Sequence, residues 1–368
     1  MKFLSAKHCP IEGKGPGMPQ ASEREKLLVI GGYGTIGGRA AQLLAEFFEG
    51  RIVVGGPNEA KAQQFADASG HGMQGIALDA TDPAQLATAL GDHRTVVNTV
   101  DSLEEAVVDA AIAAGTNYVG VVGTDVQAIR ARHNDARTTG SRILLGTGVM
   151  PGISNVIARK LSADLGGADR IVSIAVGDAG SLGPQTFSYM LREAAKPLVL
   201  PGAARPTMPY AVSVQFRFPE PREHVTAYAV RDWFSYADTL GAESVTAILM
   251  EPAPLRQVMH LAARARITKA LAVPRIRRLV ARGLLRVTAG MKQGPMLIGV
   301  EVSRDGKSAS LCAAGASDAE WTSQGVATLA AHVHRGDVEP GVWLPEQVIE
   351  PAPYLADLER RGLKLAVP

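Results

Sequence analysis

The chain has 368 residues, 46% hydrophobic and 20% charged, which is typical of a globular protein long enough for two domains. No apolar run approaches the roughly 20 residues needed to cross a bilayer. The net charge of +2 gives no reason to expect nucleic acid, and Cys9 and Cys312 have neither metal-ligand nor disulfide-framework spacing. We therefore predict a cytoplasmic protein from a reducing compartment, without a metal site.

Residues 1–26 are polar and rich in glycine and proline. The apolar piece after Lys2 is too short for the core of a signal peptide. We expect a flexible leader, with the folded part starting at Leu27.

Leu27–Ile30 predicts a buried strand, and the pattern G-x-G-x-x-G follows at once as Gly32, Gly34 and Gly37. Residues 40–48 then continue with helical apolar spacing. In a dinucleotide-binding turn the first glycine allows the tight turn, the second lets the backbone approach a pyrophosphate, and the third lets the helix pack on the strand.

The helix that begins within this pattern is the expected phosphate site. Thr35 and Ile36 stand at its N-terminus, where backbone N–H groups point outward and favour an anion. We predict both as cofactor-binding residues, together with the three glycines.

The end of the second predicted strand, 51–54, bears on the choice of cofactor. Folds that prefer NAD place a carboxylate there for the ribose 2′-hydroxyl, and folds that prefer NADP supply cations instead. No acid occurs before Glu59, Asn58 stands at the turn, and Lys61 or Arg39 could face a 2′-phosphate. The sequence favours NADP(H) over NAD(H).

Strands and helices continue to alternate up to about residue 150, which predicts a Rossmann-type, doubly wound parallel sheet for residues 27–150. The further strands are expected at 75–79, 95–100, 118–122 and 143–146, and the helices at 83–90, 102–114 and 126–138. Ligands of such sheets bind beyond the carboxyl ends of the strands. That places Asp79 near the adenine and Asn98 nearer the nicotinamide.

Reduction of a carbonyl or imine needs an acid near the cofactor to protonate the heteroatom. The candidates are Asp101 as acid or base, Tyr118 and Asp125 as polar neighbours, and Asn155 as a substrate or nicotinamide contact. Each has a structural alternative, because Asp101 and Asp125 could cap helices and Tyr118 could be a buried core ring.

Several of these motifs resemble the saccharopine dehydrogenase/reductase-like family. The similarity covers the first 155 residues well and the tail moderately, and the middle matches only loosely. Its segments are the glycine turn 31–37, Gly-Pro-Asn-Glu-Ala-Lys at 56–61, Val-Asn-Thr-Val at 97–100, Ala-Gly-Thr-Asn-Tyr at 114–118, Gly-Val-Met-Pro-Gly-Ile-Ser-Asn at 148–155 and Pro-Gly-Val-Trp-Leu-Pro-Glu at 340–346.

The chain also departs from the family pattern. Pro57 stands where the family has an arginine, which removes a 2′-phosphate ligand and weakens the preference for NADP. Asp101 and Ser102 replace Gly-Pro, Gly120 replaces an aspartate, and Thr124 replaces a glutamate. The resemblance therefore implies a retained cofactor site and a substrate or reaction different from that of saccharopine reductase.

Residues 151–315 predict an α+β domain with a mostly antiparallel sheet, because several strands follow one another without helices between them. Strands are expected at 171–176, 212–218, 225–230, 244–249, 296–302 and 309–313, and helices at 185–195 and 254–288. The resemblance implies that this domain binds substrate and supports a homodimer. Residues 316–368 are expected to return to the nucleotide domain, starting with a helix at 317–335.

Between Glu251 and Glu301 the chain has no acidic residue. The stretch 256–292 instead accumulates cations at Arg256, Arg264, Arg266, Lys269, Arg275, Arg277, Arg278, Arg282, Arg286 and Lys292, with apolar residues at roughly helical spacing. A solvated face over a core is the favoured interpretation. An acidic or carrier-bound ligand and an anionic membrane surface stay open, and the scarcity of aromatic residues argues against nucleic acid.

The sequence thus predicts an NADP(H)-dependent oxidoreductase that reduces a C=N or C=O bond, or a C=C bond, in a small or carrier-linked metabolite of specialised metabolism. One alternative is a redox-neutral isomerase or cyclase that uses bound NADP(H). Another is a non-catalytic, NADP-responsive or membrane-associated partner protein.

Overall fold

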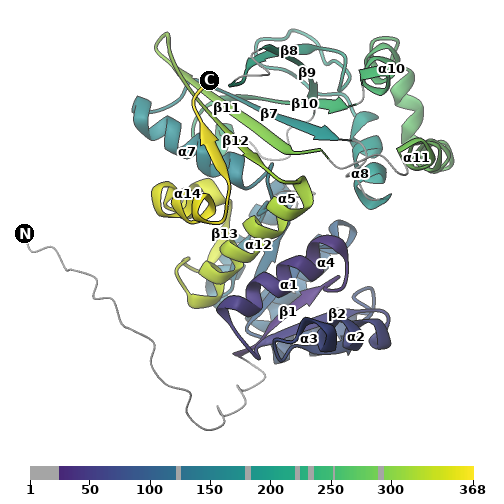
Figure 1. Cartoon of the computed structure of the whole chain (residues 1–368), viewed down its shortest axis with the longest axis vertical. Coiled ribbons are helices and arrows are strands. Elements are labelled where there is room, and N and C mark those ends of the chain that lie inside the picture. Colours follow the sequence, from purple (N-terminus) through teal and green to yellow (C-terminus); the bar gives the residue numbers. More distant parts are fainter. Residues whose placement is uncertain are drawn as a thin grey trace, which may run out of the picture.

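A computed structural model describes residues 25–121, 126–178, 184–219, 224–230, 236–251, 253–288 and 294–368. Among these residues the strands form two seven-stranded sheets, which lie one above the other in Figure 1. We call them the parallel sheet and the mixed sheet. The glycine turn belongs to the first, and the basic stretch to helices beside the second.

The parallel sheet has the order β13-β6-β5-β4-β1-β2-β3, and its described neighbours all pair in parallel. Most of its strands are fully buried, as expected for a sheet covered on both faces. The predicted doubly wound fold is confirmed. Its strands are β1 (Leu27–Ile30), β2 (Ile52–Gly56), β3 (Gln74–Ala77), β4 (Thr95–Asn98), β5 (Asn117–Gly120), β6 (Arg142–Leu144) and β13 (Gly341–Trp343).

The helices that connect these strands are α1 (Thr35–Phe47), α2 (Glu59–Ser69), α3 (Pro83–Asp92), α4 (Glu104–Ala114), α5 (Val126–Arg130) and α6 (His133–Thr139). The sequence did not predict α2, whose start is set by the side chain of Asn58, which accepts a hydrogen bond from the Lys61 N–H at 2.9 Å.

The end of the chain completes the parallel sheet. Helix α12 (Asp318–Arg335) packs along α1, and β13 then joins the sheet beside β6. Arg39 on α1 forms a two-pronged ion pair with Glu320 on α12, with Nε and Nη2 each 2.9 Å from a carboxylate oxygen. The suggestion that Arg39 faces a 2′-phosphate is therefore wrong, because its guanidinium holds two helices together.

The mixed sheet has the order β14-β12-β11-β7-β10-β9-β8. Its described pairs are antiparallel except for β7 and β10, which run parallel from Arg170 beside Glu243. The predicted mostly antiparallel sheet is confirmed. The strands are β7 (Arg170–Asp178), β8 (Ser213–Arg217), β9 (His224–Val230), β10 (Glu243–Glu251), β11 (Met296–Arg304), β12 (Lys307–Gly315) and β14 (Lys364–Ala366).

The single helix predicted for 254–288 is wrong, because three elements occupy this range. They are α10 (Ala253–Arg264), the 3₁₀ helix η4 (Ile267–Ala272) and α11 (Pro274–Thr288). Arg266 adopts a left-handed backbone conformation with φ of 58°, which ends the first helix. Pro274 begins the next one, where its missing N–H costs no helical hydrogen bond.

Five further helices complete the described fold: α7 (Ile153–Leu165), α8 (Pro184–Ala194), α9 (Tyr236–Thr239), α13 (Pro345–Val348) and α14 (Pro351–Arg360). Side-chain hydrogen bonds link three of them, since Asn155 on α7 and Thr239 on α9 both contact the buried Glu346 on α13. No helix among the described residues is long and apolar enough to cross a membrane.

Candidate functional site

The turn between β1 and α1 is built so tightly that side chains do not fit at two of its glycines. A Cβ atom on Gly37 would lie 2.3 Å from the carbonyl oxygen of Gly31, and one on Gly32 would lie 2.7 Å from that of Val29. Gly31 has a φ of +76°, which L side chains rarely adopt. The glycines at 31, 32 and 37 are therefore required by the fold of the turn itself.

Gly34 differs from these neighbours. Its residue is exposed, and a Cβ there would meet only the Gly31 carbonyl oxygen, at 3.2 Å. It is also the N-cap of α1 and offers no side chain to the first-turn N–H groups, including those of Thr35 and Ile36. An open, positively polarised helix end next to a bare glycine suits a pyrophosphate.

The end of β2 offers polar groups without a carboxylate. The hydroxyl of Tyr33 accepts a hydrogen bond from the Asn58 N–H at 3.3 Å, and its ring covers Gly56 so closely that a Cβ there would lie 2.5 Å from it. Pro57, Asn58 and Lys61 are all exposed. The residues present fit an NADP ribose, because no carboxylate follows this strand end before Glu59 and because Lys61 is exposed.

Asp79 lies beyond the end of β3, as predicted, and is exposed. Its carboxylate accepts hydrogen bonds from the hydroxyl of Thr81 at 2.6 Å and from the Thr81 N–H at 2.9 Å. These bonds hold the pKa of Asp79 below its ordinary value. The residue stays anionic at neutral pH and shapes this loop.

Behind the glycine turn, a buried polar cluster joins β4, β5 and α4. The Asn98 amide donates to the Tyr118 hydroxyl at 3.2 Å, and that hydroxyl donates to Glu104 Oε1 at 3.5 Å. Asn98 also binds the backbone of Val100 through both ends of its amide, which fixes the loop after β4. Tyr118 is fully buried, so its aromatic ring serves the core and its hydroxyl serves this cluster.

Glu104 was missed by the sequence prediction. It is only 2% exposed and stands in the first turn of α4, where the helix end favours a negative charge. A Cβ at Gly120 would lie 2.9 Å from Glu104 Oε1 and 2.7 Å from the Tyr118 hydroxyl oxygen. A carboxylate from α4 thus fills the space beside the position where the family pattern has an aspartate. The only signal in the sequence was the acidic pair at the start of this helix.

The remaining predicted catalytic residues are placed differently. Asp101 begins the 3₁₀ helix η2 (Asp101–Leu103), directly after the loop that follows β4. Asp125 lies outside the described residues. Asn155 is fully buried: its Nδ2 donates to Glu346 Oε2 at 2.8 Å, and its Oδ1 accepts from the Gly152 N–H at 3.0 Å. In this structure its amide connects helices and is not on an open surface.

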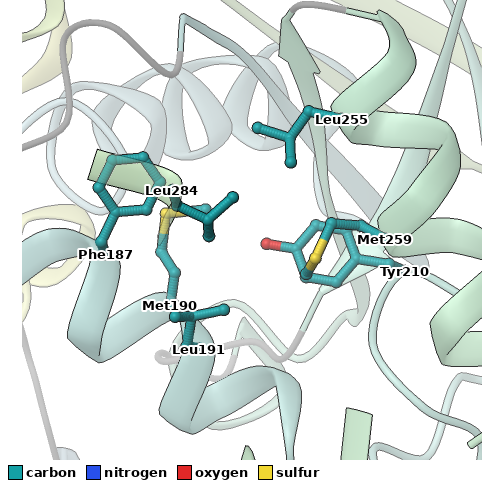
Figure 2. Close-up of a pocket in the computed structure, with 7 residues that line it drawn as sticks. All are labelled: Phe187, Met190, Leu191, Tyr210, Leu255, Met259 and Leu284. Carbon is teal, nitrogen blue, oxygen red and sulfur yellow. The ribbon is translucent and has the colours of Figure 1, made fainter. Parts of the chain in front are cut away.

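A second, separate feature is an apolar pocket under the basic stretch. Figure 2 shows it between α8, α10 and α11, with the hydroxyl of Tyr210 directed into it. Its volume of about 10 Å³ leaves room for one water molecule at most. The lining residues are Phe187, Met190, Leu191, Tyr210, Leu255, Met259 and Leu284. It is a small gap between buried and partly buried apolar side chains.

Comparison with known proteins agrees with the geometry of the turn. Residues 27–144 match the family described as the saccharopine dehydrogenase NADP binding domain. The predicted resemblance to this family and the preference for NADP(H) are thereby confirmed. No curated protein is significantly similar to the chain in sequence.

Among solved structures, the chain is similar in fold to apo saccharopine dehydrogenase (L-Glu forming) from Saccharomyces cerevisiae. The TM-score is 0.67 at 17% identity, over 93% of this chain and 99% of the other. A weaker match is the diaminopimelate (DAP) dehydrogenase of C. glutamicum in complex with DAP, with a TM-score of 0.45 at 14% identity over 93% of this chain and 100% of the other.

Proposed function

We propose that this chain, whose residues 27–144 are a saccharopine dehydrogenase-type NADP-binding domain, is a reductase that uses NADPH to reduce a C=N or C=O bond in a small or carrier-linked metabolite. The observation that carries the proposal is the open helix end at Gly34, together with exposed Lys61 and a second strand that ends without a carboxylate. This combination provides for a pyrophosphate and a 2′-phosphate together.

The reaction requires the protein to hold the pyrophosphate, to fix the loop after β4 and to donate a proton. Bound NADPH supplies the hydride. The α1 N-terminus holds the pyrophosphate, and the hydrogen-bonded Asn98 fixes the loop after β4 against the glycine turn. A proton must then reach the substrate nitrogen or oxygen, and Asp101, the first residue beyond this loop, is the proposed donor.

Tyr118 and Glu104 are proposed as positioning residues. The Glu104 carboxylate accepts a hydrogen bond from the Tyr118 hydroxyl, whose oxygen in turn accepts one from the Asn98 amide. This chain of hydrogen bonds fixes the orientation of the Asn98 amide. Tyr118→Phe keeps the ring and removes only this link. We expect it to lower kcat with little change in the affinity for NADPH, whereas a purely structural role would leave kcat unchanged in a folded variant.

The function is tested first by calorimetric titration of the full chain with NADPH, NADP⁺, NADH and NAD⁺. We expect selective binding of the phosphorylated cofactors. Gly34→Asp places a carboxylate at the phosphate site and should weaken NADPH binding at least about 100-fold, through charge repulsion and steric overlap at the helix end. Gly91→Asp is the matched control, because a Cβ at Gly91 on α3 meets nothing within 4 Å.

Loss of NADPH absorbance is then followed with panels of ketones and of imines formed from keto acids and amines. The proposal is supported if one NADPH is consumed per product and if Asp101→Asn loses this activity but still binds NADPH. Product formation without NADPH consumption would contradict it and indicate a redox-neutral isomerase or cyclase. Absence of NADPH binding would remove its basis.

A further inference from the structure

Residues 253–288, which we call the basic helical segment, carry an unusual share of the apolar surface of the molecule. Of the ten large apolar side chains that the described residues expose, seven lie in this segment. Their exposed fractions range from 40% at Ile276 to 71% at Leu279. The seven are Val258, Leu261, Ile267, Val273, Ile276, Leu279 and Val287. Isolated exposed apolar residues are common on proteins, but such a concentration marks a contact surface.

Helix α11 shows how the side chains are distributed. Ala281 and Thr288 are buried and mark the face that packs on the protein. Ile276, Leu279 and Val287 are spaced three and eight residues apart, so they share another face of the helix, and all three are exposed. A helix that only covered a core would have polar residues there. The predicted solvated face over a core therefore does not account for these three apolar side chains of α11.

A row of arginines lies beside this apolar row. Arg275, Arg278, Arg282 and Arg286 follow the spacing of one helix face and are all exposed. The basic helical segment as a whole contains nine Arg and Lys residues and no Asp or Glu, whereas the entire chain has a net charge of only +2. None of the ion pairs formed between described residues involves residues 264–288, so the eight Arg and Lys charges of 264–288 have no acidic partner within the described fold.

The segment also occupies an accessible position. In Figure 1, α10 and α11 lie at the rim of the mixed sheet, on the side away from α7 and α14 and above the nucleotide-binding half. Only their inner residues, such as Leu255, Met259 and Leu284, contact the apolar pocket of Figure 2. The outer faces are free to meet a partner.

We propose that the basic helical segment docks this protein on the surface of a lipid bilayer that carries anionic headgroups. Arginines beside aliphatic residues suit this surface, because guanidinium groups bind phosphates while the aliphatic side chains enter the boundary of the acyl chains. The segment contains no acidic residue, so its charge is of one sign throughout and complements an anionic headgroup surface.

The test is flotation of the full chain with vesicles of phosphatidylcholine alone or mixed with phosphatidylglycerol. We expect binding to the anionic vesicles and a decrease with added salt. Replacing Arg275, Arg278, Arg282 and Arg286 by Ser should weaken binding at least about tenfold, since each cation near an anionic surface contributes. Leu279→Ser with Val287→Ser should also weaken it about tenfold, although no charge changes.

Matched controls change the same chemistry elsewhere. Arg205, Arg217, Lys307 and Lys364 are exposed outside the segment, and their replacement by Ser removes the same charge. Val199→Ser with Val367→Ser removes apolar side chains that are 67% and 74% exposed. Both controls should bind like the original chain.

Three outcomes would overturn the proposal. The first is no binding to anionic vesicles. The second is equal weakening by the distant charge control, which would mean a general charge effect. The third is binding to an acidic acyl carrier protein in place of vesicles, which would make the segment a protein interface. Unchanged thermal unfolding of each variant confirms that the surface, and not the fold, was altered.

Discussion

The nucleotide-binding half and the basic helical segment use similar apolar residues in opposite ways. Leu44 on α1 is fully buried in the core of the nucleotide-binding half, whereas Leu279 on α11 is 71% exposed. Gly37 on α1 has no room for a Cβ, whereas a Cβ on Gly283 of α11 meets nothing within 4 Å. Core packing explains why Leu44 and Gly37 are the residues found there. Leu279 and Gly283 lie on a surface, and folding alone does not require those residue types at their positions.

The largest expected effect is the difference in stability between alanine variants of the two leucines. Leu44→Ala should lower the free energy of unfolding by about 2–5 kcal/mol, because it removes buried contacts and leaves a cavity. Leu279→Ala should change it by less than about 0.5 kcal/mol, because the side chain is already in solvent. Urea unfolding of both variants measures the difference. Equal losses would mean that Leu279 is buried against another part of the molecule.

Alanine variants of the two helical glycines, Gly37 and Gly283, should change the stability by smaller amounts and in opposite directions. Gly37→Ala should destabilise the fold by about 1–3 kcal/mol, because its Cβ would lie 2.3 Å from a backbone oxygen that cannot move away cheaply. Gly283→Ala should stabilise it by up to about 1 kcal/mol, since alanine is the better helix former and the space is open. Thermal melting separates them. A neutral Gly37→Ala would show that the glycine turn is looser than the contacts imply.

The smallest expected effect is on how the stability of the protein depends on pH, which a buried histidine in the nucleotide-binding half should influence. His334 is buried on α12, where its Nδ1 lies 2.9 Å from the Thr95 hydroxyl, and burial together with nearby arginines lowers its pKa to about 4. Because the unfolded chain binds this proton more readily, the stabilising contribution is complete above about pH 6.5 and is lost as the pH falls toward 4.

When the pH is lowered from 7 to 5, protonation linked to His334 should lower the free energy of unfolding by about 1–2 kcal/mol, allowing for partial solvent screening. Urea unfolding at pH 7, 6 and 5 measures it, and His334→Gln should flatten that part of the profile. Arg275→Ser, in the basic helical segment, should leave the profile unchanged, because that guanidinium is exposed and forms no ion pair with a described residue. An equally steep profile in His334→Gln would assign the pH dependence to other groups.

Much of the nucleotide-binding half was predictable because its signals are local. The strand Leu27–Ile30, the glycine turn and the following helix are consecutive in the chain, and each residue's role depends on neighbours within a few positions. The two sheets were predictable for the same reason. The break at Arg266 was not, because a left-handed arginine has no strong sequence signature.

The candidate site shows where local signals end. Tyr118 and Asn98 were identified within predicted strands of the parallel sheet, but Glu104, which contacts Tyr118, comes from the first turn of a helix. Arg39 had the right charge and location in the sequence for a phosphate ligand. Its partner Glu320 is 281 residues away, so only the packing of α12 on α1 assigns it to an ion pair.

By itself, the sequence determined that this protein has a dinucleotide-binding turn, a parallel sheet and a run of cations without acids, because these depend on residue type and short-range spacing. The tertiary structure decided which of these groups meet and which remain exposed. It buried Asn155 against Glu346, placed the Glu104 carboxylate beside Gly120, and left Leu279 and its neighbours in solvent. The reason is physical: burial and pairing depend on elements brought together from distant parts of the chain, and spacing along one element does not contain that information.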